Sequence, residues 1–112
     1  MRLIENISDE TTQRHSILFQ ETEIILTLKY SPVVEMWTAD VSYKEFNIYG
    51  FALTCGVLHM ESSNTPFGFA MQDTTGLGLD PFRRDDFSTG RVAMYLIEPD
   101  EMTEIRGIEV PL

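Results

Sequence analysis

The feature that most constrains the fold is a series of short stretches in which apolar side chains recur at every second position. In Glu35–Tyr43, Trp37 and Val41 lie on one face of an extended chain, and Thr38 and Asp40 lie on the other. This alternation is typical of a strand with one face in a core and one face in water. No stretch of ten residues shows the 3.6-residue period of a helix. The sequence therefore predicts an all-β protein.

Further stretches of the same kind follow one another along the chain. Arg14–Gln20 and Glu23–Tyr30 are expected to form a hairpin around a tight turn at Glu21–Thr22, and Phe46–Cys55 is expected to be a strand with a bulge or bend at Gly50. Shorter strands are expected near Leu3–Ile7 and over Pro66–Met71.

Strands recur about every ten to twelve residues, the spacing typical of a sandwich or small barrel. A chain of 112 residues has the length of one domain. We therefore predict that residues 1–112 form a single-domain antiparallel β-sandwich or small β-barrel. Residues 73–78 are expected to be a flexible connection, residues 57–60 either a strand or one helical turn, and the tail over residues 102–112 a last edge strand or a docking segment.

The stretch Asp80–Glu101 joins a charged loop to the most apolar strand of the sequence. Arg91–Ile97 is largely apolar on both faces, which indicates that a second sheet, a barrel wall or a partner chain covers each side. The loop carries two arginines beside two aspartates. They are expected to pair within the loop or with a copy of the loop in an oligomer, where such pairs fix register. We predict an interface formed by Pro81, Phe82, Arg83, Arg84, Asp85, Asp86, Phe87 and Arg91, and we expect Arg91 to matter more for assembly than for folding.

Charge and cysteine content exclude several classes of function. Eight Lys and Arg against 18 Asp and Glu give a net charge of −10, which disfavours binding to nucleic acid or to anionic membranes. The single cysteine, Cys55, excludes an intramolecular disulfide and is expected to be a small apolar filler inside a strand. The N-terminal residues lack the apolar segment of a signal peptide. We expect the chain to be made in, and to stay in, a reducing cytoplasm.

No arrangement of residues predicts a reaction. His15 and His59 have no cysteine or carboxylate at a metal-ligand spacing, and Trp37 is expected in the core. Asp80, Asp85 and Asp86 do not have the spacing of a calcium loop, and the neighbouring arginines would neutralise them. We expect no catalytic residue, no cofactor and no metal, and hence a protein that is not an enzyme.

The order and spacing of several scaffold motifs resemble the small baseplate plug proteins of contractile-tailed phages and their prophage relatives. The motifs are Tyr30-Ser31-Pro32, Glu35-Met36-Trp37, Ile48-Tyr49-Gly50, Ala52–Gly56, Gly78–Phe82, Asp85-Asp86-Phe87, Thr89-Gly90-Arg91 and Pro99–Met102. One departure is Phe46-Asn47, where relatives carry a more open turn of small residues.

The resemblance implies a structural component of the virion tail baseplate, placed at the distal end of the tail tube and assembled in the host cytoplasm. It implies contacts with hub, spike or tail-tube proteins and a homo-oligomeric ring of copies. Two alternatives stay open. One is a small β-barrel that binds a saccharide or similar ligand on Trp37, Tyr43 and Tyr49 beside Asp40. The other is a tail assembly or completion factor that is absent from the mature particle.

Overall fold

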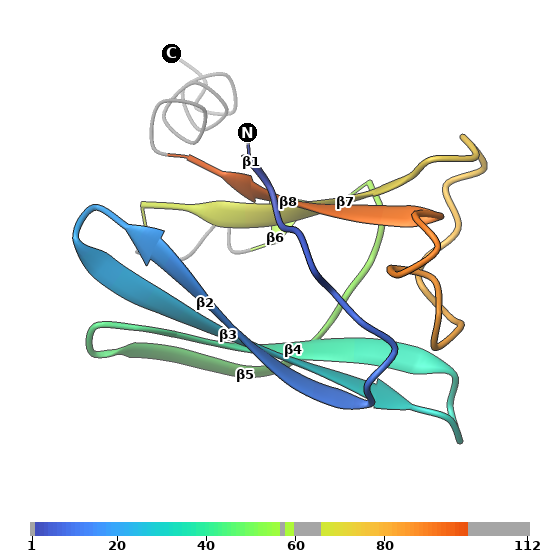
Figure 1. The fold of residues 1–112 in the computed structure, drawn as a ribbon, viewed down its shortest axis with the longest axis horizontal. Helices are drawn as coiled ribbons and strands as arrows, with labels where there is room; N and C mark the ends of the chain where they lie inside the picture. The colour runs from blue at the N-terminus through green and yellow to red at the C-terminus, as the bar shows by residue number, and fades with distance from the viewer. Residues whose placement is uncertain (1, 57, 60–65, 99–112) are drawn as a thin grey trace, which may run out of the picture.

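Two antiparallel sheets of four strands each face one another in the computed structural model, which describes residues 2–56, 58–59 and 66–98 (Figure 1). Sheet B is a meander in the order β2-β3-β4-β5. Its strands are β2 (Thr12–Phe19), β3 (Thr22–Ser31), β4 (Met36–Tyr43) and β5 (Phe46–Ala52).

Sheet A has the order β1-β8-β7-β6 and thus places the first strand beside the last. Its strands are β1 (Arg2–Leu3), β8 (Val92–Ile97), β7 (Gly68–Asp73) and β6 (Leu58–His59). The two sheets are separate, so the described residues form the predicted sandwich and not the barrel.

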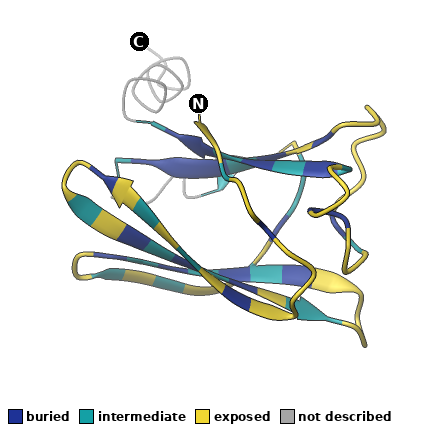
Figure 2. Cartoon of the chain, in the orientation of Figure 1, coloured by how far each residue is buried: buried dark blue, intermediate teal, exposed yellow. Residues whose placement is uncertain are grey.

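The core lies between the sheets and is built from the alternating apolar positions of the sequence (Figure 2). Leu26 and Leu28 of β3 and Trp37 and Ala39 of β4 are fully buried, and Met94 of β8 faces them from sheet A. The expected alternation in β4 is confirmed, because every second residue from Trp37 to Tyr43 is buried. Tertiary burial of one face of each strand thus accounts for the pattern in the sequence.

Aromatic side chains join the two sheets away from the β7–β8 loop. Phe67, just before β7, packs edge-to-face on Phe19 and Tyr43 of sheet B, with ring centroids 5.5 and 5.1 Å apart. Such pairs contribute about 0.5–1.5 kcal/mol beyond the area that they bury.

The first hairpin is confirmed, but its turn lies one residue earlier than expected. Phe19 pairs with Thr22, so the turn consists of Gln20 and Glu21, which have φ of 47° and 65°. A two-residue hairpin turn of this hand requires positive φ at both central residues. Here two residues without special turn propensity adopt it, because the burial pattern of β2 and β3 fixes the register.

The bulge predicted at Gly50 is present. The β4–β5 register shifts between Ala39 and Val41, and Gly50 has φ of +65°. Its N–H donates to Asp40 Oδ1 at 2.7 Å, while Asp40 also forms an ion pair with Lys29 Nζ at 2.9 Å. Asp40 therefore stabilises the bulge.

Two other expectations need correction, and one open alternative is decided. The strand ends at Ala52, so Cys55 lies beyond it; this residue is half-buried and forms an isolated bridge with Met71. Leu58–His59 is a strand and not a helical turn. Residues 73–78 are not a loose connection, because the Asp73 carboxylate accepts hydrogen bonds from them. The expected tail segment, residues 102–112, lies outside the described residues.

Trp37→Ala should lower the free energy of unfolding by about 3–5 kcal/mol, because it removes a fully buried indole. Urea unfolding of the purified chain measures this. Tyr49→Ala is the control, since Tyr49 is 75% exposed, and it should change stability by less than about 0.5 kcal/mol. A near-neutral Trp37→Ala would contradict the position of Trp37 in the core.

Candidate functional site: the β7–β8 loop and its arginine network

The β7–β8 loop, residues 74–91, covers one end of the sandwich (Figure 1). It reverses direction several times, and Gly90, with φ of +82°, makes the last turn before β8. Backbone bonds within the loop fix its shape: Asp86 N–H donates to Arg83 O, Thr89 N–H to Asp85 O, and Val92 N–H to Asp86 O. The loop is therefore built of hydrogen-bonded turns.

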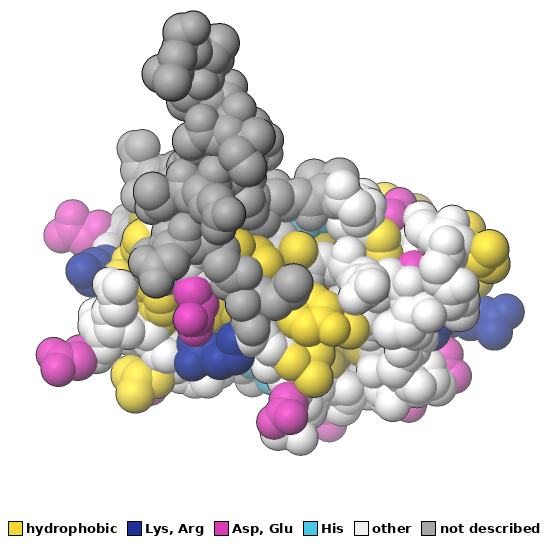
Figure 3. Space-filling view, turned by 90° about the horizontal axis from the view of Figure 1, so that it is seen from above, with side chains coloured by type: hydrophobic (Ala, Val, Ile, Leu, Met, Phe, Trp, Pro, Cys, Tyr) yellow, Lys and Arg dark blue, Asp and Glu magenta, His cyan; other side chains and the backbone are white. Residues whose placement is uncertain are grey.

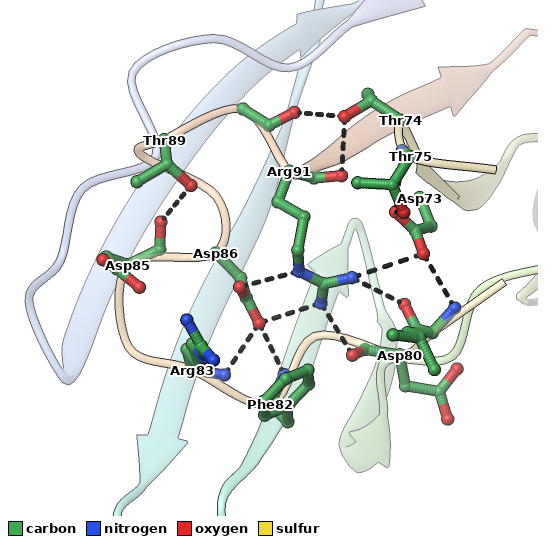
Figure 4. A network of polar contacts seen from close by, with 12 residues as sticks. Asp73, Thr74, Thr75, Asp80, Phe82, Arg83, Asp85, Asp86, Thr89 and Arg91 are labelled. Atoms are coloured by element: carbon green, nitrogen blue, oxygen red, sulfur yellow. Dashed lines mark hydrogen bonds and ion pairs between the residues drawn. The ribbon is translucent and has the colours of Figure 1, made fainter. Parts of the chain in front are cut away.

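Arg91 is the centre of a polar network in this loop (Figure 4). Its Nε and Nη2 donate to the two oxygens of Asp86 at 2.8 and 2.9 Å, in a bidentate pair. Nη2 also donates to Asp80 O at 2.8 Å, and Nη1 to Leu79 O at 3.2 Å. Nη1 lies 3.5 Å from Asp73 Oδ2. All three guanidinium nitrogens are therefore engaged within the chain, in the planar geometry that arginine favours.

Asp86 is the buried partner of this pair, with 2% of its side chain exposed. Besides Arg91, it accepts hydrogen bonds from the N–H groups of Phe82 and Arg83 at 2.8 and 2.7 Å. Burial alone would raise the pKa of the Asp86 carboxyl, but the hydrogen bonds from Arg91, Arg83 and Phe82 outweigh it and hold that pKa below its usual value. The carboxylate therefore stays charged, and both of its oxygens accept hydrogen bonds.

Asp73 plays the corresponding role at the end of β7. Its Oδ1 accepts from the hydroxyl and the N–H of Thr75 at 2.6 and 2.9 Å, and its Oδ2 accepts from Leu79 N–H at 2.9 Å. The hydrogen bond from the Thr75 hydroxyl, followed by that from Leu79 N–H, lowers the pKa of Asp73 to about 2. The two carboxylates on either side of Arg91 thus organise the loop from both of its ends.

Two aromatic side chains of sheet B hold the loop against the core. Tyr30 Oη donates to Phe82 O at 2.9 Å, and Trp37 Nε1 donates to Arg83 O at 3.0 Å. Phe87 packs edge-to-face on Trp37, with ring centroids 5.3 Å apart. The buried indole of Trp37 and the half-buried phenol of Tyr30 therefore donate their hydrogen bonds to the loop backbone and set its position.

The loop also contacts the N-terminal connection and the segment after β5. Arg84 Nε donates to Asp9 O, and Ser88 Oγ donates to Asp9 Oδ1. Cys55 N–H donates to Asp80 Oδ1 at 2.8 Å. Segments from four parts of the sequence thus meet at this end of the molecule.

The predicted interface residues differ in how far they are buried. Pro81, Asp86 and Phe87 are buried. Phe82 and Arg91 are half-buried, and the Arg91 guanidinium lies 5.1 Å from the centroid of the Phe82 ring. The stretch Arg83–Asp85 is exposed, and only this part is directly available to a partner. Pairing within the loop does occur, but Asp86 pairs with Arg91 and not with the adjacent arginines.

Sequence reasoning missed the other residues exposed at this end. The end of the sandwich formed by the β7–β8 loop and the β3–β4 turn (residues 32–35) is called the loop end here. On it Val33 is 90% exposed, Val34 63% and Leu77 73%. Figure 3 shows Lys or Arg beside hydrophobic side chains at this end, on the right. The signal available was Val33-Val34 directly after Pro32, a pair of apolar residues in a turn.

No group of His, Cys, Asp and Glu that could hold a metal ion occurs among the described residues. Burial is the main cause that raises the pKa of the Cys55 thiol, so its reactive thiolate is disfavoured. The alternative ligand platform does not form, because Trp37 and Tyr43 are buried in the core and only Tyr49 is exposed.

Comparison with protein families gives one match. A family described as cyanophage baseplate Pam3 plug gp18 matches residues 1–100. A comparison with curated proteins found no match. In the described part of the chain, no helix is long and apolar enough to cross a membrane.

Arg91→Ala should destabilise the fold by about 3–5 kcal/mol, because it leaves the buried Asp86 carboxylate without its partner. The buried pair with Asp86 favours a role for Arg91 in folding, whereas the sequence led us to expect a role mainly in assembly. Urea unfolding near neutral pH measures the loss. Arg84→Ala, at an exposed position of the same loop, is the control and should cost about 1 kcal/mol or less. Equal losses in the two variants would contradict the central role of Arg91.

Asp73 should make the stability of the chain depend on pH in the acid range. Its folded pKa of about 2 lies below the usual 3.8, so its contribution is complete above 3.8 and is lost as the pH falls towards 2. In Asp73→Asn this contribution is missing at every pH. The difference in urea midpoint between the wild type and Asp73→Asn should therefore shrink as the pH falls from about 4 to about 2. A constant difference would exclude the proposed role of the carboxylate.

Proposed function

The chain belongs to the cyanophage baseplate Pam3 plug gp18 family and is a structural component of a phage tail baseplate, and we propose that the loop end is the surface by which it docks. The neighbours in this proposal are hub, spike or tail-tube subunits at the distal end of the tail tube. The copies form a ring there, after assembly in the host cytoplasm. The role is architectural and involves no catalysis.

The observation that supports docking at the loop end is the combination of rigidity and exposed apolar surface. The network around Arg91 and the bonds from Tyr30 and Trp37 fix the loop backbone before any partner binds. A surface that is already ordered loses little conformational entropy on binding.

The chemistry of the exposed side chains also suits a protein contact. Val33 and Val34 offer apolar area, and Arg83 and Arg84 offer charge-assisted hydrogen bonds. The exposed carboxylates of Glu35, Asp80 and Asp85 lie at the same end, so its charge is mixed. A partner with an apolar patch and carboxylates opposite the two arginines would match this surface.

The double variant Val33→Asp with Val34→Asp should fold normally, because both side chains are exposed, and should be lost from purified tail baseplates. The measurement is the content of this chain in purified particles by mass spectrometry, after complementation with each variant. Lys44→Asp is the matched control: it adds the same negative charge at an exposed position in the β4–β5 turn, at the opposite end of the sandwich, and should be incorporated like the wild type (Figure 1).

Normal incorporation of the double variant would overturn docking through the loop end. If the wild-type chain itself is missing from mature particles, the chain is an assembly factor and not a resident subunit.

A further inference from the structure

The two edge strands of sheet B are longer than exposed edge strands usually are, although β2 carries Arg14 and β5 contains the bulge at Gly50. In the described residues β2 pairs only with β3, and β5 pairs only with β4. Exposed edges are normally very short, or carry charges or proline. Sheet A follows this rule, because its edge strands β1 and β6 have two residues each. By contrast, β2 has eight residues in unbroken register, and β5 has seven.

Carboxylates are absent from both edge strands of sheet B. The chain has 18 Asp and Glu residues, yet neither β2 nor β5 contains one. The carboxylates of sheet B lie on its central strands, at Glu23 in β3 and Asp40 in β4. Two copies that each carry a charge of −10 can therefore pair these two strands without placing carboxylates of the strands opposite one another.

Both edges also present backbone groups that β-sheet pairing can use. The carbonyl of Leu18 accepts from Arg2 Nη2 at 3.2 Å, so it points away from β3. Paired and outward positions alternate in an antiparallel strand, so the N–H and C=O groups of Arg14 and Ser16 point outward as well. In β5, Phe46 pairs with Tyr43 across a two-residue turn, which directs the backbone of Asn47 outward.

Apolar side chains are partly exposed along these edges. A groove of about 350 Å³ beside β2 is lined by residues 15–18 and by residues 2–6, so the N-terminal segment lies next to the end of β2. Ile17 of β2 and Ile48 and Phe51 of β5 are only half-buried. Tyr49 of β5 is 75% exposed. Pairing of the two edges would bury these side chains.

From these observations we infer that β5 of one copy pairs antiparallel with β2 of the next copy. All neighbouring strands of sheet B are antiparallel, so β2 and β5 run in opposite directions. When a second copy is placed beside the first by rotation about one axis, its β2 lies antiparallel to β5 of the first copy. Sheet B then continues from one copy to the next. This head-to-tail contact closes into a ring or extends as a filament. The inference rests on the ring of copies proposed above and names its contact.

Two proline variants test this contact by mixing. Ser16→Pro removes an outward N–H from β2, and Asn47→Pro removes one from β5; neither N–H takes part in the hairpin ladders, so both variants should fold. Sedimentation analysis should show that the wild type self-associates and that each variant alone is a monomer. An equimolar mixture should form a 1:1 dimer, because the intact β5 of one variant meets the intact β2 of the other.

Control variants separate edge pairing from loss of folding. Ser16→Ala and Asn47→Ala keep both backbone groups and should associate like the wild type. If a proline variant is unfolded by circular dichroism, Ser16→Glu and Asn47→Glu replace it, since each places a carboxylate on an edge that has none.

Three results would overturn the inference: a wild type that is monomeric at every concentration, a mixture that stays monomeric, or a dimer of Asn47→Pro alone, which would indicate pairing of β2 with itself. Because this assay uses the isolated chain, its failure leaves docking through the loop end untouched. Conversely, normal incorporation of the loop-end variant would overturn docking without affecting edge pairing.

Discussion

The structure depends on one guanidinium group held between two carboxylates. Removal of Arg91, Asp86 and Asp73 from water costs free energy, and the bidentate pair, the carbonyls of Leu79 and Asp80 and the backbone N–H groups offset that cost. A buried ion pair contributes little net stability but selects one arrangement over others. Here it joins the end of β7 to the start of β8 and fixes the loop between them, and this loop in turn carries the exposed surface.

The strands were predictable from the sequence, and the network was not. The alternation of apolar and polar residues in β3 and β4 identifies the face that packs in the core, because this alternation follows from burial of one face. The turn at Gln20–Glu21 was placed wrongly, since no residue there has a propensity for positive φ. In the loop, four charged residues lie side by side at 83–86, and sequence cannot tell which of them pair. The partner of Asp86 is five residues away, and Asp73 and Trp37 enter the network only through the tertiary fold.

Three parts of the molecule have separate physical roles. The core between the sheets supplies stability, the arginine network supplies the shape of the loop end, and the edges of sheet B are where we propose that copies pair. Carboxylates are frequent elsewhere on the chain, and they discourage contacts that are not matched by a partner. These features suit a small acidic subunit of a baseplate, the role of the family to which the chain belongs.

The most direct test of this account is electron microscopy of the intact tail at a resolution that locates the side chains of this chain. The account predicts that Val33, Arg83 and Arg84 contact a neighbouring baseplate subunit, while the Arg91–Asp86 pair stays internal as in the isolated chain. A loop end that faces solvent, or an Arg91 that leaves Asp86 to bind a neighbour, would contradict it.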